Sequence, residues 1–344
     1  MYYYIIFIYF LFLFFFTIIF SFNLNNNSKK FIFNILSLFL LLITSAHPFD
    51  YSVDDQQYLF LAQNISDNND NFLDTLDHDY LYYIILKVLL YIFPFWTSFI
   101  FISVVALLLK LYVIAKLTNY SILSLFIYFT IFFELHDLTQ FRLSLAVSFF
   151  YIAIYVIVIN KTFIKGLLFF AFSALSHFQA LPSFFVIIIS KFLRNKFYLS
   201  LFLTIVFYLF SNFTIFNVLS YFGYSVELFR ASFDTDNLLE ISKYNSYNFL
   251  IFLILIMLIH YLKKSIYSKN FYLYKTSFYS IIFGFILSTV LSGIGQESRI
   301  IQFFFTPIVF LIPLVFSDKK MYFTLTFIGM ISFLWFGHID KLFI

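Results

Sequence analysis

Two arginines at the predicted starts of apolar helices have the chemistry to bind phosphate. Arg142 opens one apolar stretch, and Arg299 opens another after a turn that contains two glycines. The free N–H groups at a helix N-terminus bind anions, and a guanidinium adds two parallel hydrogen bonds to a phosphate. A cation at this end of a helix opposes the helix dipole by a few tenths to about 1 kcal/mol, so each arginine needs an anionic partner. The sequence therefore predicts a cradle for phosphate or pyrophosphate.

The residues around the two arginines leave an alternative open. Asp137 and Gln140 have the spacing of a helix cap before Arg142, which makes Gln140 a secondary candidate for the site. Each arginine could instead reach the membrane interface or form an ion pair with a nearby acid. The acids with suitable spacing are Glu134 and Glu297, and both are therefore secondary candidates as well.

An acidic loop supplies the candidate carboxylates. The loop from His47 to Asp79 contains eight aspartates and neither lysine nor arginine. Asp54 and Asp55 follow a serine at cap spacing, so a structural role at the start of a helix running to about residue 64 is favoured for both. Asp50 precedes this cap and is not needed for it. We therefore expect Asp50 to be the catalytic carboxylate, with Asp54 and Asp55 as secondary candidates.

His177 is the second catalytic candidate. It lies in the apolar segment Leu175-Ser176-His177-Phe178-Gln179-Ala180-Leu181, where Gln179 is a further polar side chain. An ionisable residue inside a membrane segment is a functional hypothesis by default. The alternative is a histidine that only forms a hydrogen bond with a backbone carbonyl.

The composition predicts an all-α polytopic membrane protein. Of 344 residues 62% are hydrophobic, 25% aromatic and 11% charged, and the mean hydropathy is +0.94. Apolar runs of roughly 17 to 25 residues recur along the chain and are long enough to cross a bilayer. We expect a single membrane domain over residues 1–344, with a retained first helix. The chain has no cysteine, which excludes disulfides and thiolate chemistry, and neither a metal nor another cofactor is expected.

Basic residues in short connections predict the topology. Lys110 and Lys116 mark one cytoplasmic loop, whereas the acidic loop lies outside. Residues 80–93 are too short for an ordinary span, so 47–94 are predicted to form an extracytoplasmic loop followed by an interfacial helix. Residues 165–196 are predicted to form two short half-helices around His177, with one ordinary span as the alternative. The total is about 11 transmembrane segments plus the interfacial helix.

Several of these residues resemble a known family. The segment Gln140-Phe141-Arg142-Leu143-Ser144-Leu145-Ala146, followed by Ser176-His177-Phe178-Gln179-Ala180-Leu181, is similar to the central region of the EpsG family. The early Asp50-Tyr51 loop and the segment from Arg299 to Pro307 extend the resemblance to about residues 50–310. Gln179 and Ser176 depart from the family pattern around the histidine.

The resemblance implies a GT-C-like fold and a polymerase of the EpsG and Wzy type. Such an enzyme joins polyprenyl-pyrophosphate-linked oligosaccharides into O-antigen, capsule or exopolysaccharide at the outer face of the bacterial inner membrane. Arg142 and Arg299 would neutralise the pyrophosphate, and Asp50 or His177 would activate the acceptor hydroxyl. The expected partners are these lipid-linked glycans and the bilayer. A chain-length regulator and a flippase are optional further partners, and nucleic acid is not expected as a partner.

Three other functions remain open on the sequence. A GT-C glycosyltransferase that adds a single sugar from a polyprenyl-phosphate donor would make one product instead of a ladder. A transporter of lipid-linked oligosaccharides would carry cationic residues along a path to both membrane faces. A membrane O-acyltransferase would use the isolated His177 but needs an acyl-donor path from the cytoplasm.

Overall fold

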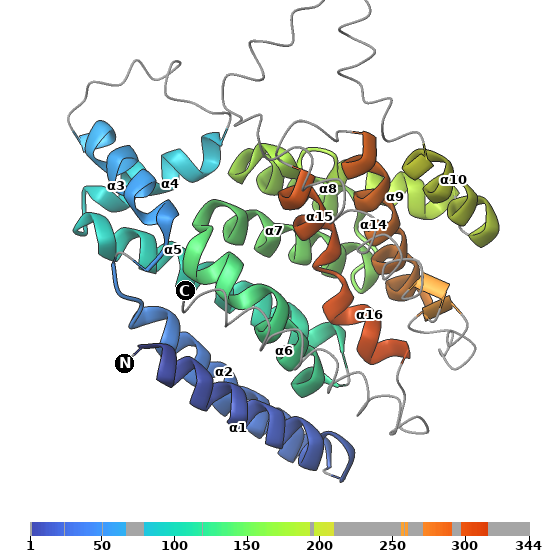
Figure 1. Ribbon diagram of the computed structural model, residues 1–344, viewed down its shortest axis with the longest axis horizontal. Helices are drawn as coiled ribbons and strands as arrows, with labels where there is room; N and C mark the ends of the chain where they lie inside the picture. Colours follow the sequence, from blue (N-terminus) through green and yellow to red (C-terminus); the bar gives the residue numbers. More distant parts are fainter. Residues whose placement is uncertain are drawn as a thin grey trace, which may run out of the picture. The chain divides into compact units, whose positions relative to one another are not determined.

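The protein is described by a computed structural model that places ten segments of the chain. They are residues 2–23, 25–49, 51–66, 79–118, 120–192, 196–209, 256–257, 259–260, 271–290 and 297–315. All regular structure within these segments is helical (Figure 1). The described residues divide into two compact units, one up to Phe184 and one from Phe185 to Val315.

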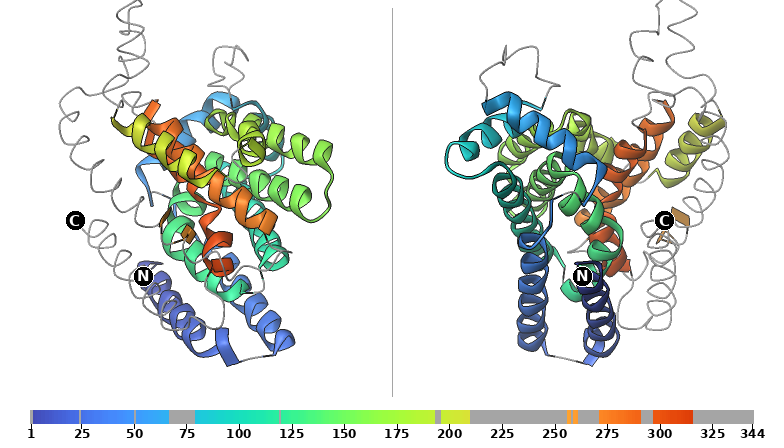
Figure 2. Two further views of the ribbon diagram at one scale, coloured as in Figure 1. Left: turned by 90° about the vertical axis from the view of Figure 1, so that its right-hand side faces the viewer. Right: turned by 60° about the vertical axis from the view of Figure 1, so that its left-hand side comes forward.

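The first unit contains the helices that build the candidate site. They are α1 (Tyr2–Asn23), α2 (Asn26–Ser45), α3 (Val53–Ser66), α4 (Tyr80–Leu90), α5 (Phe95–Leu117), α6 (Ser121–Tyr128), the π-helix η1 (Phe129–Thr139), α7 (Phe141–Val158), α8 (Phe163–Ser176) and the short 3₁₀-helix η2 (Phe178–Ala180). Helix α7 packs most extensively against α8 and α5. The helices α3 and α4 lie at the end of the unit where α2 ends and α5 begins (Figure 2).

Five of the described helical segments are long and apolar enough to cross a membrane. They are Asn27–Ser45, Phe95–Leu117, Ser121–Thr139, Phe141–Val158 and Phe271–Val290. Several shorter apolar helices accompany them. These helices agree with the predicted multi-pass membrane protein, whereas the total of about 11 spans, the GT-C-like fold and the single membrane domain stay predictions. The predicted spans after residue 315, and most of 210–270, lie outside the described residues.

Two unusual segments contain the short helices that the sequence predicted, whereas the membrane topology of both stays a prediction. Residues 80–90 form a helix of only 11 residues, α4, and its interfacial position stays a prediction. The chain also breaks at His177, where α8 ends, as expected for two short helices around this residue. Helix α9 (Ser183–Phe192) begins after the break and leads into the second unit.

Two predictions about charged residues were wrong. Lys110 was assigned to a cytoplasmic loop, but it is fully buried in α5, seven residues before the end of that helix at Leu117. Asp137 was assigned to the cap of the following helix, but it lies inside η1 and is fully buried. The residue at the cap position of α7 is Gln140, whose side chain makes no capping bond. Lys110 and Asp137 pair with each other, which explains why both can leave the membrane surface.

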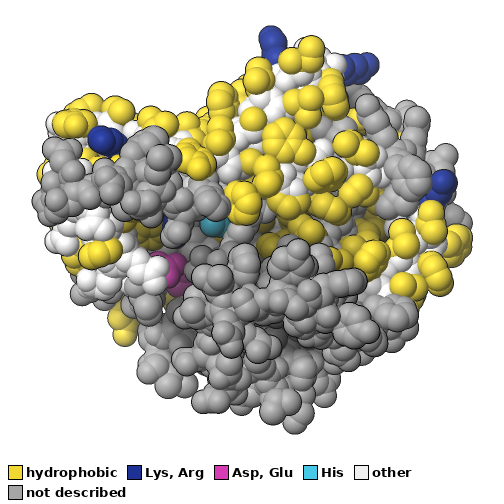
Figure 3. Space-filling view, turned by 90° about the horizontal axis from the view of Figure 1, so that it is seen from above, with side chains coloured by type: hydrophobic (Ala, Val, Ile, Leu, Met, Phe, Trp, Pro, Cys, Tyr) yellow, Lys and Arg dark blue, Asp and Glu magenta, His cyan; other side chains and the backbone are white. Residues whose placement is uncertain are grey.

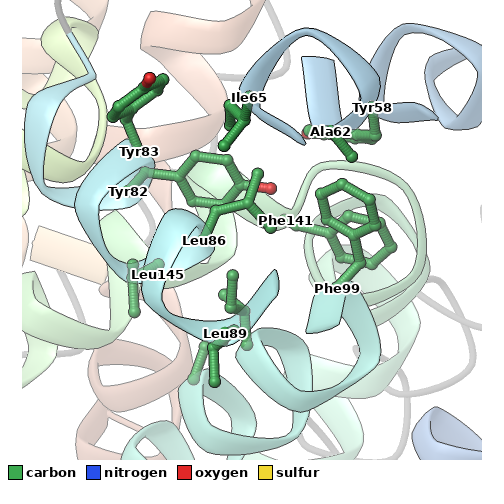
Figure 4. Close-up of a cluster of buried hydrophobic side chains, with 12 residues drawn as sticks. Tyr58, Ala62, Ile65, Tyr82, Tyr83, Leu86, Leu89, Phe99, Phe141 and Leu145 are labelled. Carbon is green, nitrogen blue, oxygen red and sulfur yellow. The ribbon is translucent and has the colours of Figure 1, made fainter. Parts of the chain in front are cut away.

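A cluster of buried hydrophobic side chains joins the four helices next to the site (Figure 4). It consists of Tyr58, Ala62 and Ile65 of α3, Tyr82, Tyr83, Leu86 and Leu89 of α4, Phe99, Ile102 and Ala106 of α5, and Phe141 and Leu145 of α7. The rings of Phe99 and Phe141 stack at 5.8 Å between centroids. Because the cluster includes the residue before Arg142 and spans most of α4, it fixes the start of α7 relative to α4.

The second unit is centred on α14 (Phe271–Val290). This helix packs against α10 (Phe197–Leu209), α15 (Glu297–Phe305) and α16 (Ile308–Val315). Gly284 permits the close approach of α14 and α15, since a Cβ atom at this position would lie 2.1 Å from Cβ of Phe304. The helix that the sequence predicted to begin at Arg299 is present as α15. A turn at Thr306 and Pro307 separates it from α16.

His47 occupies an aromatic cage between α2 and α3. Its ring lies 4.9 Å from Tyr51, 5.4 Å from Trp96, 5.8 Å from Tyr2 and 6.2 Å from Phe141 between centroids. The ring is buried, and neither nitrogen has a hydrogen-bond partner in the described part of the chain. Burial lowers the pKa of His47 from 6.5 to about 4. The cage therefore holds this histidine in its neutral form.

We expect acid to weaken the wild-type protein through His47. Below pH 6.5 His47 binds a proton in the unfolded chain but stays neutral in the folded cage. The free energy of unfolding therefore falls between pH 6.5 and 4, by about 2 kcal/mol at pH 5. His47→Phe should remove this part of the loss because phenylalanine fits an aromatic cage without titrating. Thermal unfolding of the detergent-solubilised protein at pH 7 and pH 5 measures the difference. An equal loss in both proteins would show that His47 does not contribute.

Candidate functional site

Asp79 is the centre of a polar cluster that joins three distant parts of the first unit. Its Oδ2 atom accepts a hydrogen bond from Nη1 of Arg142 at 3.0 Å and lies 3.2 Å from Nδ1 of His177. Its Oδ1 atom accepts a hydrogen bond from the backbone N–H of Phe178 at 2.8 Å. The side chain of Gln179 completes the cluster, with Oε1 3.1 Å from Nε2 of His177. The candidate site is therefore Asp79, Arg142, His177 and Gln179.

Local helix ends place each group of this cluster. Asp79 occupies the cap position of α4, yet its carboxylate makes no capping bond there and is directed to the cluster instead. His177 adopts an extended conformation after the last residue of α8, which frees the N–H of Phe178 from helical bonding. Arg142 lies in the first turn of α7. Three helix ends therefore meet at one carboxylate.

Arg142 is the most accessible charged group of the site. Its side chain is 26% exposed, compared with 9% for each of Asp79 and His177. The guanidinium lies 5.8 Å from the centre of the Tyr58 ring, within the range of a cation–π interaction. In the space-filling view from above, one histidine and one acidic side chain are visible at the surface (Figure 3). Arg142 therefore retains surface for a further anion while it is paired with Asp79.

The surroundings of Asp79 favour its ionised form. Burial alone would raise the pKa of this carboxyl, but the hydrogen bond and charge of His177, followed by the charge of Arg142, hold the pKa below its ordinary value. This pairing stabilises the fold at any pH above the ordinary aspartate pKa of about 3.9, and the contribution is lost as the pH falls through the lowered pKa.

The geometry suits proton transfer next to an anion. A carboxylate that accepts a hydrogen bond from Nδ1 of a histidine fixes the tautomer and leaves Nε2 as the basic nitrogen. In His177 this nitrogen lies 3.1 Å from Oε1 of Gln179, so the neutral tautomer requires the Gln179 amide to be turned so that its NH₂ group donates to Nε2. A nearby arginine can neutralise negative charge that develops on a leaving group. The cluster thus combines an oriented general base with a cation.

Other predicted residues have structural roles or separate contacts. Asp55 is buried and caps α3, since Oδ2 accepts hydrogen bonds from the backbone N–H groups of Tyr51 at 2.8 Å and Ser52 at 3.1 Å. This agrees with the capping role expected for it. Asp54 lies half-buried in the same turn. Glu134 accepts a hydrogen bond from the hydroxyl of Tyr51 at 2.6 Å, whereas the carboxylate that forms the ion pair with Arg142 is that of Asp79.

The structure describes the side chain of Gln140 but not those of the other remaining candidates. Gln140 precedes α7, and its buried Oε1 atom has no hydrogen-bond partner among the described residues. Arg299 and Glu297 lie in the first turn of α15 in the second unit, but their side chains lie outside the described residues. Asp50 also lies outside them. The predicted pairing of two arginines and the catalytic role of Asp50 stay predictions.

The sequence interpretation missed Asp79. It is one of eight aspartates in its loop and has no local motif. One signal was available: Asp79 is the last acidic residue before a short apolar helix, so it must lie where that helix begins. Its partners are 63 and 98 positions away in sequence, and only the fold brings them together.

Residues 30–342 match the model of the EpsG family, a stretch that includes Asp79, Arg142 and His177. The chain belongs to the EpsG family. Comparisons with curated proteins and with solved structures give no match. Membership of the EpsG family confirms the resemblance found in the sequence and associates the chain with polysaccharide polymerases and related membrane glycosyltransferases.

Proposed function

We propose that this EpsG-family protein polymerises polyprenyl-pyrophosphate-linked oligosaccharides and that Asp79, Arg142 and His177 form its active centre. The observation that carries the proposal is the single carboxylate shared by a histidine and an arginine. Glycosyl transfer from an activated lipid donor requires removal of a proton from the acceptor and neutralisation of the departing pyrophosphate. The cluster has one group suited to each task.

The reaction would proceed in one balanced transfer. An acceptor hydroxyl attacks the anomeric carbon of the donor, and the bond from this carbon to the pyrophosphate oxygen breaks as the new glycosidic bond forms. Nε2 of His177 takes the hydroxyl proton, a contribution of roughly 10² to 10⁴ in rate. Asp79 stabilises the imidazolium that results. Arg142 stabilises the negative charge on the polyprenyl pyrophosphate.

A wholly apolar groove supports a lipid substrate. It lies between α1 and α2, has a volume of about 470 Å³ and is lined by residues such as Phe12, Ile35 and Phe39. Tyr2 also lines the groove and contacts the ring of Tyr51 at 5.5 Å between centroids. Such a groove suits a hydrocarbon chain. We further propose that the site faces the outer side of the bacterial inner membrane.

Polysaccharide profiling in a deletion strain tests the proposal. The strain is complemented with wild type, Asp79→Asn, Arg142→Ala, His177→Ala or the control Lys116→Gln, which changes an exposed lysine outside the site. The wild type and the control should restore a ladder of polymer lengths, whereas the three site variants should leave a single repeat at equal membrane expression. A ladder that survives deletion would reject polymerisation. A single added sugar in the wild type would instead indicate a GT-C glycosyltransferase.

A further inference from the structure

A second polar network lies buried beside the candidate site. Nζ of Lys110 in α5 lies 2.5 Å from Oδ1 of Asp137 in η1, and both side chains are fully buried. The hydroxyl of Ser144 in α7 donates to the same oxygen at 2.6 Å and accepts from Lys110 at 2.8 Å. The hydroxyl of Tyr128 donates to Oδ2 of Asp137. The side chain of Asp137 is thus held by residues of three helices.

Such a network is costly inside a membrane segment. Removing two opposite charges from water costs free energy that their attraction barely repays, and a well-packed apolar pair of similar size would stabilise the fold as well or better. Ionisable residues in these segments therefore point to function. The wide turn of a π-helix is also frequent at functional sites. Stability alone does not account for this ion pair.

The network is attached to the turn that carries Arg142. Asp137 lies in the last turn of η1, Gln140 links η1 to α7, and Ser144 shares the first turn of α7 with Arg142. The hydroxyl of Ser103 in α5 donates to the backbone carbonyl of Asp137 at 2.5 Å, which ties the main chain down as well. Both sides of the turn are thus anchored to α5, since Lys110 bonds to Asp137 before it and to Ser144 after it.

The same anchorage fixes His136, which precedes Asp137. His136 is fully buried, and neither ring nitrogen has a hydrogen-bond partner in the part of the chain that the structure describes. It lies within electrostatic range of both Lys110 and His177. His136 is therefore held in place together with Asp137 in the last turn of η1.

We propose that the Lys110–Asp137 ion pair is a positioning device for the candidate site. The ion pair fixes the turn between η1 and α7. This turn sets the positions of Arg142 and His136 relative to Asp79 and His177. Lys110 and Asp137 act through these residues and do not contact substrate. The effect on catalysis rests on the proposed function, whereas the effect on position does not.

A charge-removal series separates positioning from stability. Lys110→Met and Asp137→Leu each leave one buried charge without its partner, so both single variants should unfold at lower temperature. The double variant Lys110→Met/Asp137→Leu removes both charges and should unfold near the wild-type temperature. Glycosyl transfer by the double variant should still fall on the order of a hundredfold, because small misplacement of a catalytic group is sufficient for such a loss.

A distance measurement reports position without relying on activity. The natural chain has no cysteine, so Thr139→Cys at the turn and Tyr80→Cys at the start of α4 give two unique sites for spin labels. We expect a narrow distance distribution in the labelled parent and a broad or shifted one when the ion pair is removed. This result would support the proposal even if the polymerase assignment failed.

Two outcomes would overturn the proposal. A double variant with parental stability, activity and label distances would show that the ion pair is dispensable. If the double variant does not regain stability, Tyr128→Phe and Ser144→Ala replace it. Each removes one hydrogen bond from an uncharged hydroxyl to Asp137 and leaves the charges paired, and Ser144→Ala also removes the bond that Lys110 donates to Ser144. Unchanged activity and unchanged distances in both of these variants would also reject a positioning role.

Discussion

Asp79→Asn is expected to reduce turnover by roughly 10² to 10⁴ with little change in the fold. Asparagine has nearly the same shape, but it removes the negative charge that stabilises a protonated His177. It also offers an amide donor to Nδ1, which favours the tautomer that carries its proton on Nε2. The basic nitrogen of His177 would then be Nδ1, which does not face the hydroxyl of the acceptor sugar. Initial rates with a purified lipid-linked repeat measure the effect.

The conservative variant Asp79→Glu provides the matched control. Glutamate keeps the charge but moves the carboxylate, so partial activity is expected, above that of Asp79→Asn. Thermal unfolding of all three proteins checks that the comparison is made between folded molecules. Asp79→Asn with wild-type turnover would show that the carboxylate does not serve His177, and the proposed general base would have to be abandoned.

Arg142→Gln is expected to lower kcat/KM by roughly 10²- to 10³-fold, because it removes one donor to a developing negative charge. Glutamine cannot neutralise the pyrophosphate, and it leaves the carboxylate of Asp79 without its cation. Arg142→Lys keeps the charge but not the planar pair of donors, so it should lie between glutamine and the wild type. Steady-state kinetics with varied donor concentration measure this order.

Inhibition by inorganic pyrophosphate separates leaving-group binding from a purely structural role of Arg142. The wild type should be inhibited, Arg142→Lys more weakly, and Arg142→Gln least. The variant Asp79→Asn should retain inhibition because it leaves the guanidinium in place and frees it from its ion pair. Equal inhibition of the wild type and Arg142→Gln would contradict a pyrophosphate site at this arginine.

The sequence was most informative where an ionisable residue interrupts an apolar segment. His177 could be selected for this reason, because the free energy cost of an ionisable side chain in a membrane segment is large enough to need an explanation. Arg142 could be selected because a cation at the start of a helix needs an anionic partner. The break at His177 followed from the length of the segment, which is too short for two ordinary spans. The structure brings both residues to one carboxylate.

The sequence was least informative where a contact joins distant positions. Apart from its place just before a short apolar helix, nothing set Asp79 apart in the acidic loop, and no periodic pattern connects it with α7 or α8. Lys110 was misassigned because the charge rule treats every lysine as a loop residue, and Asp137 was misassigned because its spacing from Gln140 is that of a helix cap. A pair of opposite charges 27 positions apart can neutralise each other inside the protein, and sequence spacing does not reveal it.

The hydrogen bond from the N–H of Phe178 to Asp79 has a further consequence for comparing relatives of this protein. The donor belongs to the main chain, so any residue except proline supplies it equally well at this position. Position 178 can vary freely in an alignment while the contact persists. A survey based on conserved side chains would therefore overlook one of the groups that hold the carboxylate, because this group is a main-chain N–H at the end of a helix.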